Sequence, residues 1–245
     1  MDKSIQIKKL KTDGYLLVSH AFCEDEIREM RLKVLSSLHH MSNTRPTKTA
    51  FHISGFHKHL ELEHFHQKIS GNKQVISALK AIYGEGTIVS LGISDITINR
   101  SQDWHTDLLR GPYASFINPD FCWSRSAMPC LKVLVYLQDG DSLSVVPGSH
   151  FTPIDLSNDL NAIPNVNDDI TMVSAKAGDV ILMDIRLIHR GATEEQMQEK
   201  AIGIDSKILI STVFGEKSDP LARSIQQGQI KRLLDWEIRN PSSKI

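Results

Sequence analysis

The sequence predicts a mainly β protein with flanking helices, in which the strands build a barrel or a sandwich. Residues 87–215 carry short runs of β-branched or alternating apolar residues between turn residues, whereas the segments before and after them show helical spacing. The chain has 245 residues, of which 40% are hydrophobic and 23% charged, so it can bury one substantial core. We therefore expect one domain over residues 1–245, with a helical part at about 1–85, a β core at about 87–215 and a C-terminal helix at about 220–240.

The first third of the chain predicts one strand and two helices. Gly14–His20 (GYLLVSH) is typical of a short strand. Apolar residues recur at helical spacing over Cys23–Leu38 and again over about Asn72–Tyr83, where the following EGT ends the helix. The intervening Ser42–Gln67 is polar and rich in histidine, and it shows no clear period.

Turn residues divide the β-rich region into six predicted strands. These are Thr87–Asn99, Leu131–Gln138, Ser144–Val146, Ile170–Val173, Val180–His189 and Lys207–Phe214. Pro147 and Gly148 supply the fixed φ and then the positive φ that a type II turn requires. Apolar positions within Pro220–Asn240 predict a closing helix.

The composition argues against nucleic acid and membrane surfaces as partners. The formal net charge is -1, the sequence pI is about 6.8, and the basic residues are scattered along the chain. The N-terminus lacks the apolar core of a secretory signal, and later apolar runs are broken well before about 18 residues. We expect a soluble cytoplasmic protein whose three cysteines, which have no C-x-x-C spacing, are ordinary thiols. The oligomeric state stays open.

His105 and Asp107 are candidate metal ligands. They stand two positions apart in WHTD, so in a strand they project to the same side with Cα atoms roughly 6.5 to 7 Å apart. Two histidines and one carboxylate hold Fe(II) on one face and leave the opposite face open for chemistry. His189 ends an alternating apolar row that begins at Ile181, which predicts that it looks into the barrel as a third ligand. The alternative for His189 is a core histidine bonded to a backbone carbonyl, and His59-Leu60-Glu61 is a chance His-x-acid match.

Four ordered blocks carry a family resemblance: TDGYLLV, WHTD, LKVLVYLQD followed by SLSVVPGSH, and AGDVILMDIRLIHRG. Through them the chain resembles the phytanoyl-CoA dioxygenase-like family of Fe(II)/2-oxoglutarate-dependent oxygenases. The resemblance implies a double-stranded β-helix (jelly-roll, cupin-like) core, Fe(II) as the metal, and 2-oxoglutarate and O2 as cosubstrates. It also implies that His105, Asp107 and His189 are the iron ligands.

The reaction implied by the resemblance is oxidation of a C–H bond of a small-molecule metabolite, coupled to decarboxylation of 2-oxoglutarate to succinate. Relatives that halogenate replace the carboxylate ligand by a small residue, so the presence of Asp107 favours hydroxylation. Desaturation or cyclisation in a biosynthetic pathway uses the same ligands and stays an alternative. Other classes also stay open, namely a metal-holding barrel that only binds a ligand, and a barrel whose metal is a Lewis acid for isomerisation or hydrolysis.

The far carboxylate of 2-oxoglutarate in this family meets a basic residue, typically arginine, on the strand after the distal histidine. Here the strand KILISTVF places Lys207 at that position, and an ammonium supplies charge without the fork of a guanidinium. The alternative is a lysine at an exposed strand end, and the rival anchor Arg190 is turned away from His189 by alternation. Asp95, Thr97 and Asn99 share one polar face, and Thr97 or Asn99 is a candidate to hydrogen-bond the cosubstrate, unless that face is simply solvated.

The substrate candidates lie around the long connection from Asp107 to Leu131. Long loops without evident structure are often functional, and this one mixes aromatic residues with Arg110 and Arg125. We expect it to line the substrate pocket, with Trp104 beside it and one of the arginines holding an anionic group. The alternative is that both are ordinary surface arginines.

His57, His59, His64 and His66 form a second conspicuous cluster, together with Glu61 and Glu63. A carboxylate-bridged di-iron bundle needs Glu-x-x-His pairs on separate helices, whereas both pairs here overlap on one segment. We interpret the cluster as a polar lid or solvated helix, with adventitious metal binding as the alternative.

Overall fold

The computed structural model describes residues 3–44, 47–107, 115–118, 122–124, 126–152 and 169–239. The α-helices are α1 (Lys3–Asp13), α2 (Glu24–Ser36), α3 (Glu63–Ser70), α4 (Lys73–Tyr83), α6 (Glu194–Met197) and α7 (Pro220–Arg239). Short 3₁₀ helices are η1 (Leu38–His40), η2 (Phe56–Lys58) and η4 (Ser149–Phe151). The strands are β1 (Tyr15–Val18), β2 (Ser42–Asn43), β3 (Phe51–Ser54), β4 (Ile88–Ile98), β5 (Leu131–Tyr136), β6 (Gly140–Val145), β7 (Thr171–Ala175), β8 (Val180–Asp184), β9 (His189–Arg190) and β10 (Ile208–Glu216).

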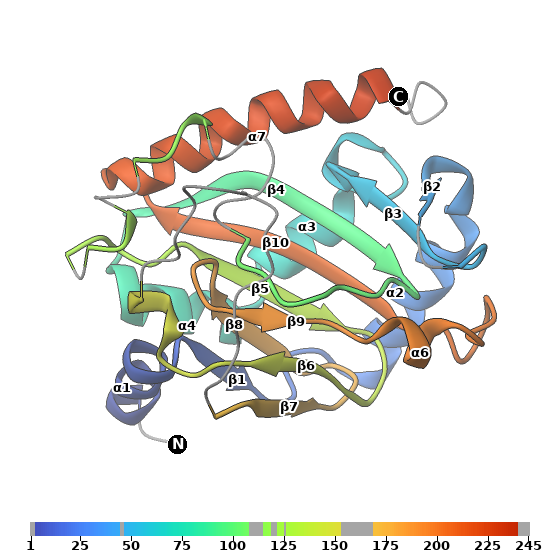
Figure 1. The fold of residues 1–245 in the computed structure, drawn as a ribbon, viewed down its shortest axis with the longest axis horizontal. Coiled ribbons are helices and arrows are strands. Elements are labelled where there is room, and N and C mark those ends of the chain that lie inside the picture. Colours follow the sequence, from blue (N-terminus) through green and yellow to red (C-terminus); the bar gives the residue numbers. More distant parts are fainter. Residues whose placement is uncertain are drawn as a thin grey trace.

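Two antiparallel sheets form the centre of the protein. The major sheet has the strand order β1-β8-β5-β10-β4-β3-β2, and the minor sheet has the order β7-β6-β9. In Figure 1 the minor sheet lies in front of the major sheet, and α3 and α4 lie behind it. The chain crosses repeatedly between the two sheets, as the predicted double-stranded β-helix requires.

Side-chain alternation on β5 separates the two faces of the major sheet. Val133 and Val135 pack into the core shared with the helices, whereas Leu134 and Tyr136 pack against the minor sheet. Lys132 has the same parity as Leu134, so it also points between the sheets, where it lines a cavity. Alternation along β5 thus places the cationic side chain of Lys132 in the interior.

The neighbouring β4 repeats this division. Ile96 and Ile98 are fully buried in the helix-side core, and Asp95 and Thr97 line the cavity between the sheets. Because the polar residues of β4 share one parity, they face the same space as Lys132.

The closing helix α7 runs along β4, as Figure 1 shows in red above that strand. Leu221 and Ile225 of α7 are buried against Leu91 and Ile93 of β4. Its later residues line the cavity, so the prediction of a C-terminal helix is confirmed and the helix contributes to the site.

Most predicted elements are confirmed with ends shifted by up to four residues: the strand near the N-terminus, the two helices α2 and α4, and five of the six core strands. The segment without a clear period contains β2, β3 and α3, which are too short to show a pattern. The prediction of one strand over Val180–His189 is wrong. β8 ends at Asp184, the chain turns with Leu187 N donating to Asp184 O at 2.9 Å, and His189 begins β9 in the other sheet.

Within the described part of the chain, every helix is too short or too polar to cross a bilayer.

Candidate active site

The side chains of His105, Asp107 and His189 lie close together in the structure. His105 Nε2 lies 3.8 Å from Asp107 Oδ1, and His189 Nε2 lies 3.8 Å from Asp107 Oδ2. The two imidazole rings are 4.2 Å apart between centroids, and one ligand atom from each of the three residues lies within 4.8 Å of the others. Both histidines are buried, and the Asp107 side chain is 24% exposed, so the group is open on the carboxylate side.

The hydrogen bonds of the two histidines fit a metal site. His105 Nδ1 lies 2.5 Å from the backbone oxygen of Asp103, and His189 Nδ1 lies 2.9 Å from that of Leu187. A carbonyl oxygen only accepts, so each Nδ1 carries the proton and each Nε2 keeps its lone pair for a metal. The donor set of two imidazole nitrogens and one carboxylate oxygen suits Fe(II).

Backbone pairing brings these distant residues together. His105 and His189 exchange two backbone hydrogen bonds of 2.9 Å, and Asp107 N donates to Ile185 O at 3.0 Å. His105 therefore sits in an isolated bridge rather than in the continuous strand that the sequence predicted. The turn after β8 thus holds the His-x-Asp segment in place.

That turn is fixed by a buried ion pair. Arg186 donates to the Asp184 carboxylate at 2.9 Å from Nε and at 2.7 Å from Nη2, and its backbone N–H donates to Oδ1 at 2.9 Å. Both side chains are 3% exposed or less. Arg186 also donates to the backbone oxygen of Cys122 at 3.0 Å. The two charges neutralise each other inside the core, and the pair fixes the backbone turn that leads to His189.

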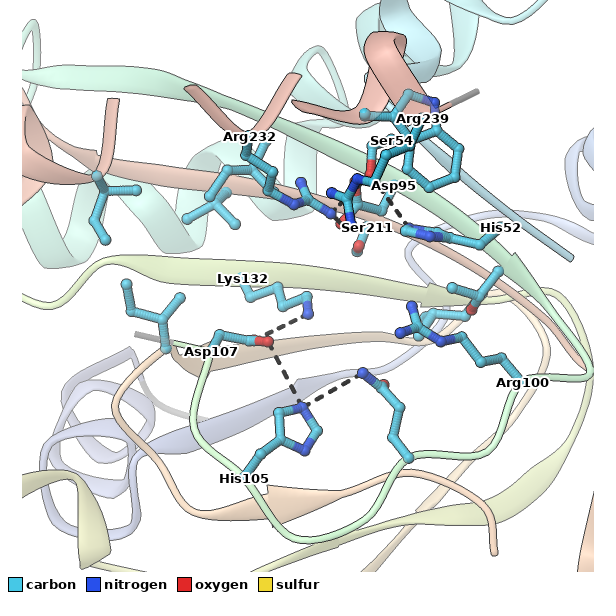
Figure 2. Close-up of a pocket in the computed structure, with 18 residues that line it drawn as sticks. His52, Ser54, Asp95, Arg100, His105, Asp107, Lys132, Ser211, Arg232 and Arg239 are labelled. Atoms are coloured by element: carbon cyan, nitrogen blue, oxygen red, sulfur yellow. Dashed lines mark hydrogen bonds and ion pairs between the residues drawn. The ribbon is translucent and has the colours of Figure 1, made fainter. Parts of the chain in front are cut away.

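A cavity of about 400 Å³ opens beside the candidate ligands, within the size range of small-molecule sites. His105, Asp107 and Lys132 line the part nearest the candidate metal centre (Figure 2). Ile185, Leu209 and Val213 supply apolar surface, and Ser211 and Gln102 supply polar atoms.

Strands β3 and β4 and helix α7 form the opposite wall. In Figure 2 Asp95, Ser54 and Arg232 gather there, with Arg239 nearby and His52 beside them. Arg232 donates to Asp95 Oδ2 at 2.7 Å and to Ser54 Oγ at 2.9 Å.

Burial and nearby charges determine the protonation states of His52 and Asp95 on this wall. Burial, and the nearby cations Arg100, Arg232 and Lys132, lower the pKa of His52 to about 3, so His52 is neutral. Burial raises the pKa of Asp95, but Arg232 and other neighbours outweigh it, and the net pKa lies below its ordinary value. Asp95 is therefore a carboxylate.

Lys207 precedes β10 and lies over the ring of Tyr136, with Nζ 5.8 Å from the ring centroid. Burial lowers its pKa from 10.5 to about 8. Among the described residues no carboxylate lies within ion-pair distance of its ammonium. The cavity lining includes its strand neighbour Leu209 but not Lys207 itself.

The other sequence candidates lie in different places. Thr97 lines the cavity. Asn99 does not, because its amide accepts from Lys207 N at 2.8 Å and donates to Ala201 O at 3.2 Å. Trp104 is also absent from the lining and packs under Arg190, whose guanidinium carbon is 5.0 Å from the ring centroid.

Arg110 and Arg125 lie outside the described residues. The structure instead places Arg100, Arg232 and Arg239 around the cavity, together with Lys132. Sequence reasoning missed all four. For Lys132 a signal existed, since it is the one charge within the apolar run LKVLVYL.

The histidine cluster does not form a di-iron site. His59 is buried against His40 with a ring distance of 4.6 Å, so the interpretation as a solvated helix is wrong for this residue. Glu61 instead approaches His39 and His40, where the three form a partly exposed group of possible ligands. Lys33 Nζ lies 3.7 Å from the same carboxylate, which offsets its charge.

The comparisons with known proteins agree with this geometry. The sequence model of the family described as Phytanoyl-CoA dioxygenase (PhyH) matches residues 10–195. No curated protein sequence matches the chain.

Solved structures share the fold at low sequence identity. The epimerase SnoN in complex with Fe3+, alpha ketoglutarate and nogalamycin RO has a TM-score of 0.65 at 14% identity, over 87% of this chain and 83% of that chain. The carbocyclase SnoK from nogalamycin biosynthesis has a TM-score of 0.61 at 15% identity, over 88% and 84%. HygX from Streptomyces hygroscopicus, with nickel, 2-oxoglutarate and hygromycin B bound, has a TM-score of 0.60 at 16% identity, over 87% of each chain.

The fold and the site define a jelly-roll protein with a candidate metal centre of two histidines and one carboxylate. The chain belongs to the phytanoyl-CoA dioxygenase (PhyH) family, whose model covers most of its length. It is thus an Fe(II)/2-oxoglutarate-dependent enzyme that uses O2, and family membership decides for this class over a barrel that only binds a ligand.

Proposed function

We propose that this enzyme hydroxylates a C–H bond of a small anionic metabolite and that His105, Asp107 and His189 hold its iron. The observation that carries the proposal is the approach of the three ligand atoms to within 4.8 Å of one another. Ligands on one face of the metal leave positions for 2-oxoglutarate and O2 on the other. When bound, iron and 2-oxoglutarate supply an oxidation by O2 that releases succinate and CO2.

The surrounding residues orient the ligands and the cosubstrate. The backbone oxygens behind His105 and His189 keep both Nε2 atoms directed at the metal position. Lys207 is our candidate for the far carboxylate of 2-oxoglutarate, because a buried ammonium is costly until it gains a counter-charge. Thr97 on the cavity side of β4 is a candidate hydrogen-bond donor to the same molecule.

The charges around the cavity support an anionic substrate. Among the described residues, those that line it include four cations, namely Arg100, Lys132, Arg232 and Arg239, against the two carboxylates of Asp95 and Asp107. Asp107 would also face the bound metal, so basic residues predominate in the described part of the lining. A concave site with one predominant sign of charge attracts ligands of the opposite sign. We therefore expect a carboxylate or phosphate on the substrate, with Arg100 and Arg239 as its contacts.

Anaerobic addition of Fe(II) and 2-oxoglutarate tests the metal centre. We expect a weak visible charge-transfer band in the wild-type protein, and succinate formation once O2 is admitted. His189→Ala and Asp107→Ala should lose both signals, while His64→Ala, a partly exposed histidine on α3, should keep them. Retention of the band in both ligand variants would contradict the assignment.

The outcome of the oxidation is tested by product mass. Succinate release is first measured against a panel of carboxylate and phosphate metabolites, and the product of any active member is then weighed. A gain of one oxygen supports hydroxylation, whereas a loss of two hydrogens indicates desaturation or cyclisation. The second result is a real alternative, because SnoK, which shares the fold, is described as a carbocyclase.

We also propose a cytoplasmic location. Cys23, Cys122 and Cys130 are free thiols, as expected for a protein kept in a reducing compartment.

A further inference from the structure

The cavity wall opposite the candidate metal ligands holds the carboxylate of Asp95. Among the described residues only one of its two oxygens has a hydrogen-bond donor. Asp95 Oδ2 accepts from Arg232 at 2.7 Å. Asp95 Oδ1 is buried and has no hydrogen-bond partner among the described residues. Figure 2 shows this carboxylate on the wall across from Asp107, with Lys132 between them.

Neither Arg232 nor His52 satisfies Oδ1. Arg232 is directed to the other oxygen and to Ser54, and it is further fixed by Gln229, whose Oε1 accepts from Nη1 at 3.2 Å. His52 is neutral and its Nε2 lies 3.5 Å from Ser54 Oγ. A buried, charged acceptor without a donor costs free energy, and such groups in native proteins call for a specific explanation.

We propose that Asp95 Oδ1 accepts a hydrogen bond from a hydroxyl or amino group of the prime substrate, so that the enzyme selects acids that carry such a donor. The inference rests on the proposed function, since it describes the substrate of the same site. The cations Arg100 and Arg239 take the acidic group of that substrate, and Asp95 takes its donor. Trp236, which also lines the cavity, supplies an aromatic surface next to His52, at a ring distance of 4.8 Å.

This arrangement gives selectivity as well as affinity. A site built around a buried acceptor rejects an analogue that lacks the donor, because the acceptor is then left unpaired. Arg232 reinforces the effect, since it holds the carboxylate in one orientation before the substrate arrives.

Matched acids test the proposal. The wild-type enzyme, loaded with Fe(II) and 2-oxoglutarate without O2, is titrated with short straight-chain and phenyl-substituted carboxylates. Each is offered in three forms, unsubstituted, hydroxylated and aminated, and binding is followed by calorimetry. We expect at least one donor-bearing form to bind roughly tenfold or more tightly than its unsubstituted parent. The hydroxylated and aminated arms distinguish the two donors. Equal binding of all three forms, or no binding of any form, would overturn the proposal.

Two variants separate the role of Asp95 in substrate preference from that of the residues around it. Asp95→Asn keeps an oxygen for Arg232 and puts an NH2 group where Oδ1 stands, so the donor-bearing acids should lose their advantage while the unsubstituted acids bind as before. Ser54→Ala removes the other contact of Arg232 without changing Oδ1, so it should keep the preference. Loss of the preference in both variants, or in neither, would show that Oδ1 is not the acceptor.

The visible band of the iron and 2-oxoglutarate complex keeps the two hypotheses apart. If the wild-type enzyme never shows the band, the proposed function fails. A normal band without any preference for donor-bearing acids refutes the role of Asp95 alone.

Discussion

Nζ of Lys132 lies 2.9 Å from Oδ2 of Asp107, so a cation from the middle of the barrel is held against one of the candidate iron ligands. Burial raises the pKa of the Asp107 carboxyl, but the charges of Lys132, His189 and His105 outweigh it and bring the pKa below its usual range. The carboxylate is thus charged and oriented before any metal binds. Lys132 uses Oδ2, so Oδ1 would stay available to the iron that we propose at this site.

We predict that Lys132→Met lowers Fe(II) affinity or turnover about tenfold to a hundredfold, as is usual when a residue that orients a metal ligand is lost. Lys132→Gln keeps a hydrogen-bond donor without the charge, so Fe(II) affinity and turnover should fall much less in this variant. Anaerobic Fe(II) titration and succinate formation measure the two quantities. Wild-type behaviour of the Met variant, or an equal loss in both variants, would speak against an orienting hydrogen bond.

Removing the buried charge behind the site should affect stability first. Asp184→Ala leaves Arg186 buried without its partner, and such a loss costs about 3 to 5 kcal/mol. The turn that carries Ile185 and leads to His189 should also loosen, which weakens iron binding. Denaturant unfolding measures the free energy, with Asp25→Ala as the control, because its pair with Arg28 is exposed and contributes at most about 1 kcal/mol. Similar losses in the two variants would contradict the structural role of the pair.

The candidate metal ligands could be picked out from the sequence because each carries a local signal. His105 and Asp107 stand two residues apart, and His189 follows an apolar strand in a recognisable block. The predicted alternation from Ile181 to His189 is nevertheless interrupted by the turn after Asp184. The apolar residues at alternate positions from Ile181 to Leu187 continue across the turn and hide it, because the turn depends on the pairing of Asp184 with Arg186.

The far wall of the cavity was not predictable by such means. Asp95 and Arg232 are 137 residues apart, and their contact exists only because α7 packs along β4. The sequence shows a polar residue on a strand and an arginine on a helix, and each is common on a protein surface. The sequence therefore predicts substrate-binding arginines in the loop after Asp107, whereas the described cavity is lined by Arg100, Arg232 and Arg239.

Arg100 offers a direct test of the anionic substrate. Loss of a charged hydrogen bond typically costs tenfold or more in binding, so Arg100→Met should raise KM for an acidic substrate about tenfold to a hundredfold. KM for 2-oxoglutarate should change little, because we assign that molecule to Lys207. Arg28→Met, on the exposed side of α2, is the matched control. A rise in KM for 2-oxoglutarate instead would make Arg100 the cosubstrate anchor.

The role of Lys207 predicts a pH dependence. Burial lowers the pKa of this lysine from 10.5 to about 8, so the free enzyme loses the ammonium as the pH rises through about 8. Burial penalises the charged form of this lysine. Between about pH 8 and 10.5 the folded state therefore binds fewer protons than the unfolded chain. A bound 2-oxoglutarate carboxylate favours that charged form. Affinity for 2-oxoglutarate should therefore be constant below pH 8 and fall by up to about tenfold per pH unit above it.

Lys207→Arg is the control, because a guanidinium stays charged across this range and should remove the decline. Lys207→Met should weaken 2-oxoglutarate binding at every pH and leave Fe(II) binding intact, since Lys207 is not one of the candidate ligands. Calorimetric titration of the anaerobic Fe(II) enzyme between pH 7 and 9.5 measures these affinities, within roughly the window that the two pKa values define. A decline that persists in the arginine variant would assign the titration to another group and return the cosubstrate anchor to the cavity arginines.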